Sequence, residues 1–563
     1  MRTYKWQDYI DEALIKDVYP EDYQKLGEGL LELILPYISS ERDKKTQYSE
    51  KDSILITYGD SIYKEGEKPL VTLKNFAEIY FKDCLSAIHL LPIYPYTSDD
   101  GFSVKDYKSI DPKLGDWEDI KAISLNFDLM LDAVINHISK ESQWFKNYQN
   151  GVEPYTDFFF EKEEGFDVSQ VIRPRALPLF HTYETHKGPK SLWTTFSEDQ
   201  LDLNYSAYTL IIELAKVLLK YGDNGAKYIR LDAIGFAWKT SGTTCMHLPQ
   251  THKVIQLFRQ LFDCCFDDVK LITETNVPHQ DNISYFGNGY NEAHMVYQFP
   301  LPPLTFYTLI TEDATYLLNW LSEIQPPSKE TTFFNFLASH DGIGMRPMEG
   351  VLTEDEKQLM IDATLNNGGR INYKNNADGS QSAYELNINY MDALKSVDMD
   401  ETTHIAKFIA AQAILISLQG VPGIYIHSLL GSWNWTEGVE LSGINRRINR
   451  ERLDMNQVVA ELEGSGRRHQ VYQKYTQLLN HRKQHKAFSP EANQEVIHVA
   501  PELFTILRKN KETILVMINI ASKTVTTTNL KGYKGRNIIT DERFDGNESV
   551  TVQPYEIMWI ILD

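Results

Sequence analysis

The chain has 563 residues, of which 42% are hydrophobic and 12% aromatic, the composition of a well-packed globular protein rather than a disordered one. Its 56 Lys and Arg against 78 Asp and Glu give a net charge of −22, which disfavours binding to nucleic acid or to an anionic membrane. No run is apolar enough for a membrane span, and the acidic start does not read as a signal peptide, so we expect a cytoplasmic protein, monomeric or homodimeric.

Residues 1–48 precede the first strand-like run. The segment LGEGLLELILPYISS has apolar residues at near-helical spacing, which predicts a helical extension.

Eight short apolar runs alternate with helical patterns over residues 49–480. This alternation is typical of a parallel α/β fold, and eight repeats predict a (β/α)8 TIM barrel, with a doubly wound sheet as the alternative. The runs are 53–60, 86–93, 129–137, 226–236, 269–276, 294–299, 333–341 and 423–429.

Two intervals in this pattern are too long for a single helix. They predict inserted loop subdomains at about 138–205 and 342–400, both over the barrel mouth. The second contains GGRINYKNNADGSQS, which is rich in turn-forming residues and predicts a mobile lid. Beyond the barrel, residues 481–563 alternate in strand fashion between turn clusters and predict a C-terminal antiparallel β domain.

Ionisable residues follow four of the predicted strands. They are Asp132, Asn136 and His137; Arg230 and Asp232; Glu274; and His340 and Asp341. The carboxyl ends of barrel strands share one mouth, and a carboxylate directly after an apolar strand is costly unless it is paired or functional. The set therefore predicts an active site.

These four segments resemble the conserved regions of the α-amylase family of glycoside hydrolases and transglucosidases. HDGIG at 340–344 is similar to the sucrose phosphorylase subfamily, as are TSDDGFSVKDY (97–107), VIRPRALP (171–178), LWTTFSEDQLDLN (192–204) and RRINR (446–450). The resemblance implies a retaining glucoside phosphorylase, a hexosyltransferase that forms a covalent glucosyl-enzyme between two carboxyls about 5 to 5.5 Å apart.

Roles follow from the resemblance. Asp232 is the expected nucleophile, kept ionised by Arg230; Glu274 is the general acid and base; and Asp341 stabilises the transition state. The residues expected to hold the glucosyl unit are Asp99, Phe102, His137, Phe196, Gln200, Arg230, His340 and Arg446. Arg175 and Tyr384 are expected to bind phosphate, which is a co-substrate. No cofactor or metal is expected, since His181 and His186 lack a third ligand.

The charge of the acceptor site should decide which acceptor the enzyme uses. Glu385 is expected in the acceptor site, where its carboxylate would accept hydrogen bonds from a polyol and repel an anion, and this favours glucosylglycerol. Arg370 and Lys374 lie in the same loop and could instead receive a carboxylate or phosphate, which favours glucosylglycerate. Sucrose 6'-phosphate and sucrose are further alternatives, and an inactive carbohydrate-binding barrel is the non-enzymatic one.

Overall fold

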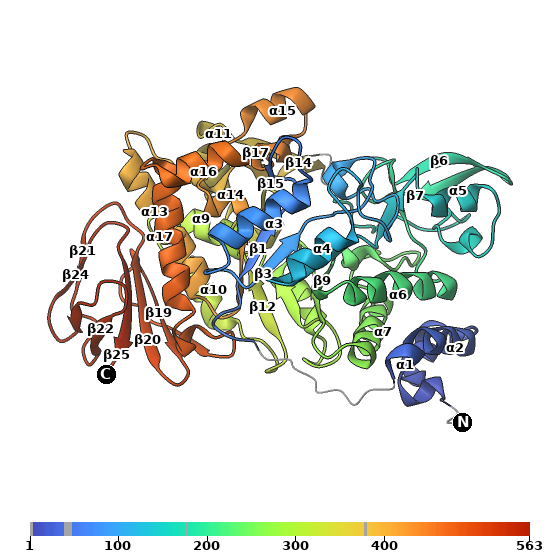
Figure 1. The fold of residues 1–563 in the computed structure, drawn as a ribbon, viewed down its shortest axis with the longest axis horizontal. Coiled ribbons are helices and arrows are strands. Elements are labelled where there is room, and N and C mark those ends of the chain that lie inside the picture. The colour runs from blue at the N-terminus through green and yellow to red at the C-terminus, as the bar shows by residue number, and fades with distance from the viewer. Residues whose placement is uncertain (1–3, 39–47, 175–176, 376–379) are drawn as a thin grey trace.

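The centre of the molecule is a closed barrel of eight parallel strands. In this computed structural model, which describes residues 4–38, 48–174, 177–375 and 380–563, each of the eight predicted runs supplies one strand, in chain order around the barrel (Figure 1). The strands are β1 (Ile54–Thr57), β3 (Ala87–Leu90), β4 (Asp128–Ala133), β9 (Ala226–Leu231), β10 (Lys270–Thr273), β11 (Met295–Tyr297), β12 (Thr332–Asn335) and β16 (Val421–Tyr425). The predicted TIM barrel is confirmed.

Helices surround the barrel. They are α3 (Pro69–Tyr80), α4 (Trp117–Ser124), α6 (Tyr208–Asp223), α7 (Pro249–Cys265), α9 (Leu301–Thr311), α10 (Thr315–Glu323), α13 (Glu401–Ser417) and α17 (Arg467–Arg482). The helix α6 shows why these segments are helical: Leu210, Leu214 and Leu218 recur every four residues and are all buried. In contrast α13 is buried on nearly every side, because it contacts α9, α17 and the C-terminal sheet.

The N-terminal segment forms two helices, α1 (Glu12–Val18) and α2 (Tyr23–Ile34), which pack against α6 and α7. The side chain of Asp11 caps α1 by accepting from the backbone N–H of Ala13. The Tyr19 hydroxyl donates to the carbonyl of Tyr205, so this pair of helices is fixed to the outside of the barrel. Part of the predicted extension, at 39–47, lies outside the described residues.

Long insertions follow β4 and β12. The first contains β5 (His137–Ser139), α5 (Gln143–Gln149) and the strands β6 (Phe180–Thr185), β7 (Gly188–Trp193) and β8 (Gln200–Asp202). The second contains α11 (Glu354–Asn366), α12 (Tyr390–Ala393) and a three-stranded antiparallel sheet of β13 (Ile343–Gly344), β15 (Gln381–Asn387) and β14 (Arg370–Asn375). The GGRINYKN segment, expected to form turns, is therefore largely a strand, because β15 supplies it with a partner ladder.

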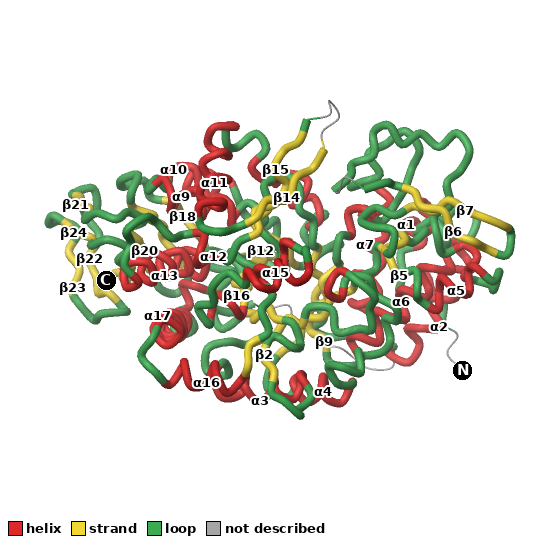
Figure 2. The backbone as a smooth tube through the Cα atoms, turned by 90° about the horizontal axis from the view of Figure 1, so that it is seen from above, coloured by secondary structure: helices red, strands yellow, loops and turns green. Residues whose placement is uncertain are grey.

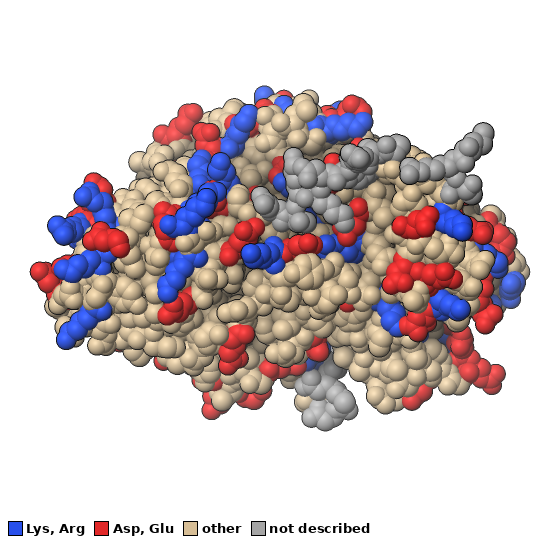
Figure 3. Space-filling model, turned by 90° about the horizontal axis from the view of Figure 1, so that it is seen from below, with Lys and Arg blue, Asp and Glu red and all other residues tan. Residues whose placement is uncertain are grey.

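A C-terminal antiparallel domain lies at one end of the long axis, opposite the first insertion, as both Figure 1 and Figure 2 show. It is a six-stranded sheet of β18 (Asn493–Val496), β19 (Leu503–Lys509), β20 (Thr513–Asn519), β25 (Ile557–Leu562), β22 (Lys534–Asn537) and β23 (Arg543–Asp545), with a smaller pair, β21 (Val525–Thr527) and β24 (Val550–Val552). This confirms the predicted β domain. Among the described helices, none has the length and apolar character that a bilayer crossing requires. On the face drawn in Figure 3, acidic and basic side chains are interspersed.

Candidate active site

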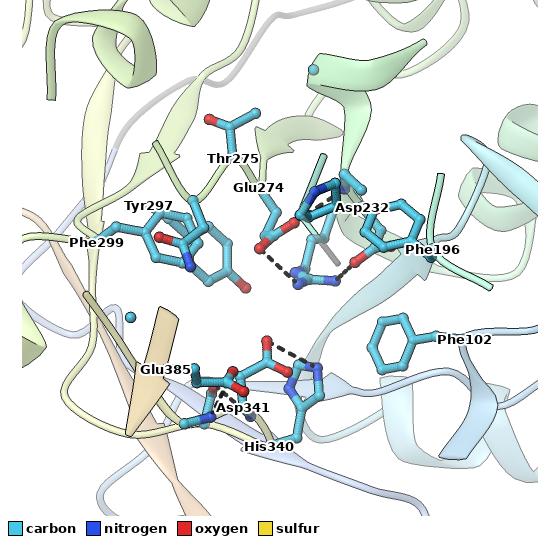
Figure 4. Close-up of a pocket in the computed structure, with 18 of the residues that line it drawn as sticks. Phe102, Phe196, Asp232, Glu274, Thr275, Tyr297, Phe299, His340, Asp341 and Glu385 are labelled. Atoms are coloured by element: carbon cyan, nitrogen blue, oxygen red, sulfur yellow. Dashed lines mark hydrogen bonds and ion pairs between the residues drawn. The ribbon is translucent and has the colours of Figure 1, made fainter. Parts of the chain in front are cut away.

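A pocket opens at the carboxyl ends of the barrel strands. Asp232 follows β9, Glu274 follows β10, and Asp341 lies on the loop after β12; in Figure 4, Asp232 and Glu274 face Asp341 across the cavity. Every described residue to which the resemblance gave a role lines this pocket: Asp99, Phe102, His137, Phe196, Gln200, Arg230, Asp232, Glu274, His340, Asp341, Tyr384, Glu385 and Arg446. Asp132 and Asn136, from the same set of strand-end residues, are buried and do not line it. Arg175 lies outside the described residues.

Arg230 joins the carboxylates of the barrel mouth. Its side chain, 2% exposed, pairs through Nη1 with Asp132 and with Asp232 Oδ1 at 2.7 Å, and its Nη2 lies 3.8 Å from Glu274 Oε1. Asp132 also accepts a hydrogen bond from His89 at 2.8 Å, so a second group fixes it. One guanidinium therefore holds Asp232 and Glu274 beside each other.

The ionisation of these two carboxyls depends on opposing effects. Burial raises the pKa of Asp232; Arg230 lowers it, and Glu274 raises it further, so the pKa lies above its ordinary value. Burial likewise raises the pKa of Glu274 against the effect of Arg230. The sequence-based expectation that Arg230 alone would keep Asp232 ionised is thus too simple, because burial in a cluster of carboxylates outweighs one shared arginine.

Asp341 is surrounded by positive charge. Burial tends to raise its pKa, but Arg446, Arg450 and Arg230 outweigh burial and hold the pKa below its ordinary value. Arg446 Nη1 contacts Asp341 Oδ1 at 2.9 Å. His340 is buried, and burial lowers its pKa to about 3, so the imidazole is neutral at neutral pH. Asp341 is therefore an anion beside a neutral histidine.

The wall opposite Tyr297 and Phe299 is built from the first insertion and the loop after β3. His137 and the Gln200 amide both contact the Phe102 carbonyl oxygen, at 2.8 and 3.1 Å, and Gln200 also donates to Asp99 Oδ2 at 3.3 Å. The Phe102 ring stacks on His340 with centroids 4.9 Å apart, and the Phe196 ring lies 5.1 Å from His137. Polar groups flanked by aromatic faces suit a sugar ring.

The loop that carries Asp99 is held in an unusual conformation. Asp99 and Asp100 have φ of 54° and 46°, a left-handed region that non-glycine residues enter at a cost. The Asp100 carboxylate pairs with Arg447 at 2.7 Å and Arg450 at 2.8 Å. These pairs fix the loop to the 3-10 helix Asn445–Asn449 and the residue after it, in the segment that also carries Arg446.

The hairpin β14–β15 closes another side of the pocket. Glu385, 2% exposed, accepts from Arg446 Nε at 3.1 Å and from the Asn372 amide at 3.0 Å. Arg370 and Lys374, the cations expected to receive an anion, do not line the pocket. Arg370 donates to the carbonyls at 368 and 369, and Lys374 pairs with a glutamate at 349 at 2.7 Å.

Sequence reasoning missed several pocket residues. His89 and Tyr297 lie on barrel strands inside apolar runs, where nothing local separates a site residue from a core residue. Asn276 and Arg346 follow Glu274 and Asp341 by two and five positions, and that proximity was an available signal. His181 shares a 2.7 Å hydrogen bond with the Thr194 hydroxyl.

A closed (β/α)8 barrel with three carboxylates around arginines at its mouth defines a barrel enzyme that acts on glycosidic bonds. Residues 80–365 match the model of the α-amylase catalytic domain, and the chain belongs to this family.

Its relatives narrow the class further. The chain is 42% identical to the glucosylglycerate phosphorylase of Escherichia coli strain K12, over 99% of both chains, and 31% identical to the glucosylglycerol phosphorylase of Marinobacter adhaerens, over 77% of this chain and 87% of the other. In fold it is similar to the sucrose 6F-phosphate phosphorylase of Thermoanaerobacter thermosaccharolyticum, with a TM-score of 0.75, 24% identity, and 90% and 99% of the two chains covered. The chain is a glycosyltransferase-type enzyme, like these phosphorylases.

Proposed function

We propose that this protein is a retaining glucosylglycerate phosphorylase, which uses inorganic phosphate to convert an α-glucoside of glycerate into α-glucose 1-phosphate and glycerate. The observation that carries the proposal is the 42% identity to a glucosylglycerate phosphorylase over essentially the whole chain. The likeness to a glucosylglycerol phosphorylase is lower and covers less of the chain. Glycerate therefore replaces glycerol as the preferred acceptor.

The charge argument for glycerol is weaker in the folded protein. It required a free carboxylate at Glu385, but Arg446 and Asn372 engage both of its oxygens. A carboxylate paired with a guanidinium repels an anionic acceptor much less than an unpaired one. Glu385 thus no longer argues against glycerate.

In the first half-reaction, an Asp232 oxygen attacks the anomeric carbon of the glucosyl unit while the bond to the glycerate oxygen breaks. Glu274 gives its proton to that oxygen, and glycerate leaves. The contacts suit this division, because Arg230 touches Asp232 at 2.7 Å and lies farther from Glu274, at 3.8 Å. Burial favours a proton on either carboxyl, and the closer cation favours leaving the negative charge on Asp232, with the proton on Glu274.

In the second half-reaction, a phosphate oxygen attacks the same carbon, the ester bond to Asp232 breaks, and the phosphate proton passes to Glu274. Tyr384 lines the pocket, and burial raises its pKa to about 12, so its hydroxyl stays protonated and can donate to phosphate. Asp341 would stabilise the positive charge that develops on the sugar ring in both steps.

Acceptor preference tests the proposal. The protein is incubated with α-glucose 1-phosphate and, separately, with glycerate, glycerol, fructose and fructose 6-phosphate, and the release of phosphate is measured. We expect the highest kcat/KM with glycerate. A preference for glycerol would show that the enzyme is a glucosylglycerol phosphorylase instead. Phosphate release at the same slow rate with all four compounds would show that none of them is its acceptor.

A further inference from the structure

Arg346 lines the pocket and forms no ion pair with any carboxylate in the described part of the chain. It begins the 3-10 helix Arg346–Met348, two residues after β13, and its side chain is partly exposed to the cavity. The pocket's other arginines are engaged: Arg230 pairs with Asp132 and Asp232, and Arg446 pairs with Asp341 and Glu385. A guanidinium that lines a pocket without such an ion pair is suited to an anionic ligand.

Arg346 lies close to Tyr384, the residue of the hairpin β14–β15 that is expected to bind phosphate. The Met345 N–H donates to the Tyr384 carbonyl at 3.0 Å, which fixes the Arg346 backbone to the hairpin β14–β15. Burial is the largest influence on the pKa of Tyr384; beyond burial, Glu385 and Glu274 raise this pKa, and Arg446 and Arg346 lower it. Tyr384 is thus close to both the expected proton donor and Arg346.

A buried hydrogen-bond acceptor lies against Gly344, two residues before Arg346. Asn276 also lines the pocket, two residues beyond Glu274, and its side chain packs against the backbone of Gly344 so closely that a Cβ at 344 would lie 2.8 Å from Asn276 Nδ2. Its Oδ1 is buried and has no hydrogen-bond partner in the described part of the chain. An unoccupied acceptor that lines a pocket can accept a hydrogen bond from a ligand that enters it.

We propose that Arg346 is the residue that determines acceptor specificity by receiving the carboxylate of glycerate, with Asn276 Oδ1 accepting from a glycerate hydroxyl. The inference rests on the proposed function and adds the acceptor-binding residues to it. The planar guanidinium bonds two carboxylate oxygens at once, and glycerol offers no group that uses this geometry. Inorganic phosphate is also an anion that enters this pocket, so the test must separate the two ligands.

Arg346→Gln removes the charge and keeps a polar side chain. The donor is α-glucosyl fluoride, which forms the glucosyl-enzyme without bringing phosphate into the pocket. Glycerate, glycerol and phosphate are then supplied in separate reactions, and kcat/KM is measured for each acceptor. We expect kcat/KM for glycerate to fall roughly a hundredfold, while the value for glycerol stays within about threefold. Arg346→Lys should keep part of the preference for glycerate.

Lys374→Gln is the matched control, because it removes one positive charge from the same insertion outside the pocket. It should leave all three acceptors unchanged. Thermal unfolding of each variant reports on folding.

The outcomes separate clearly. A loss with glycerate but not glycerol supports the inference, whether or not phosphate is also affected. A loss with phosphate alone makes Arg346 a phosphate ligand and overturns the inference, as does an equal loss with all three acceptors or an unchanged ratio of glycerate to glycerol. Wild-type enzyme that cannot use glycerate at all would refute the proposed function itself and the inference with it.

Discussion

Asp232 and Glu274 are two carboxyls on adjacent barrel strands, and their surroundings give them different tasks. Arg230 contacts Asp232 at 2.7 Å, whereas its distance from Glu274 is 3.8 Å. Two coupled carboxyls that share one cation titrate as a pair. Burial favours a proton on the pair, and the closer contact with Arg230 favours leaving the negative charge on Asp232, the state that attack requires.

Asp232→Asn should lower kcat with the natural glucoside by more than about a hundredfold, since an amide cannot form the glucosyl ester. Its thermal midpoint should not fall, because burial and neighbouring carboxylates already raise the pKa of Asp232 and so disfavour its charge. Steady-state rates and calorimetry measure the two effects. Activity above a hundredth of wild type would mean that Asp232 is not the nucleophile.

Glu274→Gln should lose about a hundredfold or more with the natural glucoside, whose leaving oxygen needs a proton. With α-glucosyl fluoride, whose leaving group needs none, formation of the glucosyl-enzyme should recover towards the wild-type rate. The readout is fluoride release in a single turnover, compared with glycerate release from the glucoside. If both donors decline by the same factor, the proton comes from another group.

Among the elements, the hairpin β14–β15 contributes to the site by positioning an arginine. Glu385 of β15 binds Arg446, and Arg446 in turn contacts Asp341, so a strand of the second insertion orients a group beside the reacting sugar. The loop after β3 is fixed in a similar way through Asp100.

Glu385→Gln should lower kcat/KM for glycerate and glycerol together, by roughly tenfold, because the bond it loses is to Arg446 rather than to either acceptor. Glu349→Gln is the control and should have no effect, because Glu349 directly follows the 3-10 helix Arg346–Met348 and pairs with Lys374 away from the pocket. A loss confined to glycerol would show that Glu385 contacts the acceptor after all.

Asp100→Asn should weaken sugar binding and stability. Asparagine tolerates the left-handed backbone, but Arg450, whose side chain is 4% exposed, would lose its 2.8 Å partner. We expect the free energy of unfolding to fall by about 2 kcal/mol and KM for the glucoside to rise. Asp116→Asn, which alters an exposed pair with Lys68 and keeps a good helix cap, should change neither. An unchanged KM would show that the loop holds its shape without these pairs.

At the scale of the whole molecule, buried neutral histidines make stability depend on pH. Burial lowers the pKa of His340 and of His427 to about 3 in the folded chain, whereas an unfolded histidine titrates near pH 6.5. Below about pH 6.5 the unfolded state therefore binds more protons than the folded state. The stability from these groups is complete above that pH and is lost as the pH falls towards 3.

Lowering the pH from 7.5 to 5 should reduce the free energy of unfolding by about 2 kcal/mol for each such histidine. His427 lies in α14 (Ile426–Leu429), outside the pocket lining, and can be replaced without touching the site. The loss of stability over this pH range should be smaller by about that amount in His427→Asn than in wild type, as measured by denaturant unfolding at both pH values. Equal losses in the two proteins would contradict the assignment.

The sequence by itself determined the barrel and the positions of its strand-end residues. Apolar runs at strand spacing are a local signal, and a parallel barrel necessarily brings their carboxyl ends to one mouth, so Asp232, Glu274 and Asp341 could be placed together before the fold was known. The inserted strand β14 was missed because its residues favour turns and only pairing with β15 makes them a strand.

Which charged side chains form ion pairs was decided by the tertiary structure alone. Glu385 pairs with Arg446, 61 positions away, and Asp100 with Arg450, 350 positions away, while the nearby cations Arg370 and Lys374 point to other partners. Arg346 lines the pocket instead, five positions after Asp341. An ion pair depends on distance in space, and that distance follows from how the loops pack over the barrel rather than from any pattern along the chain.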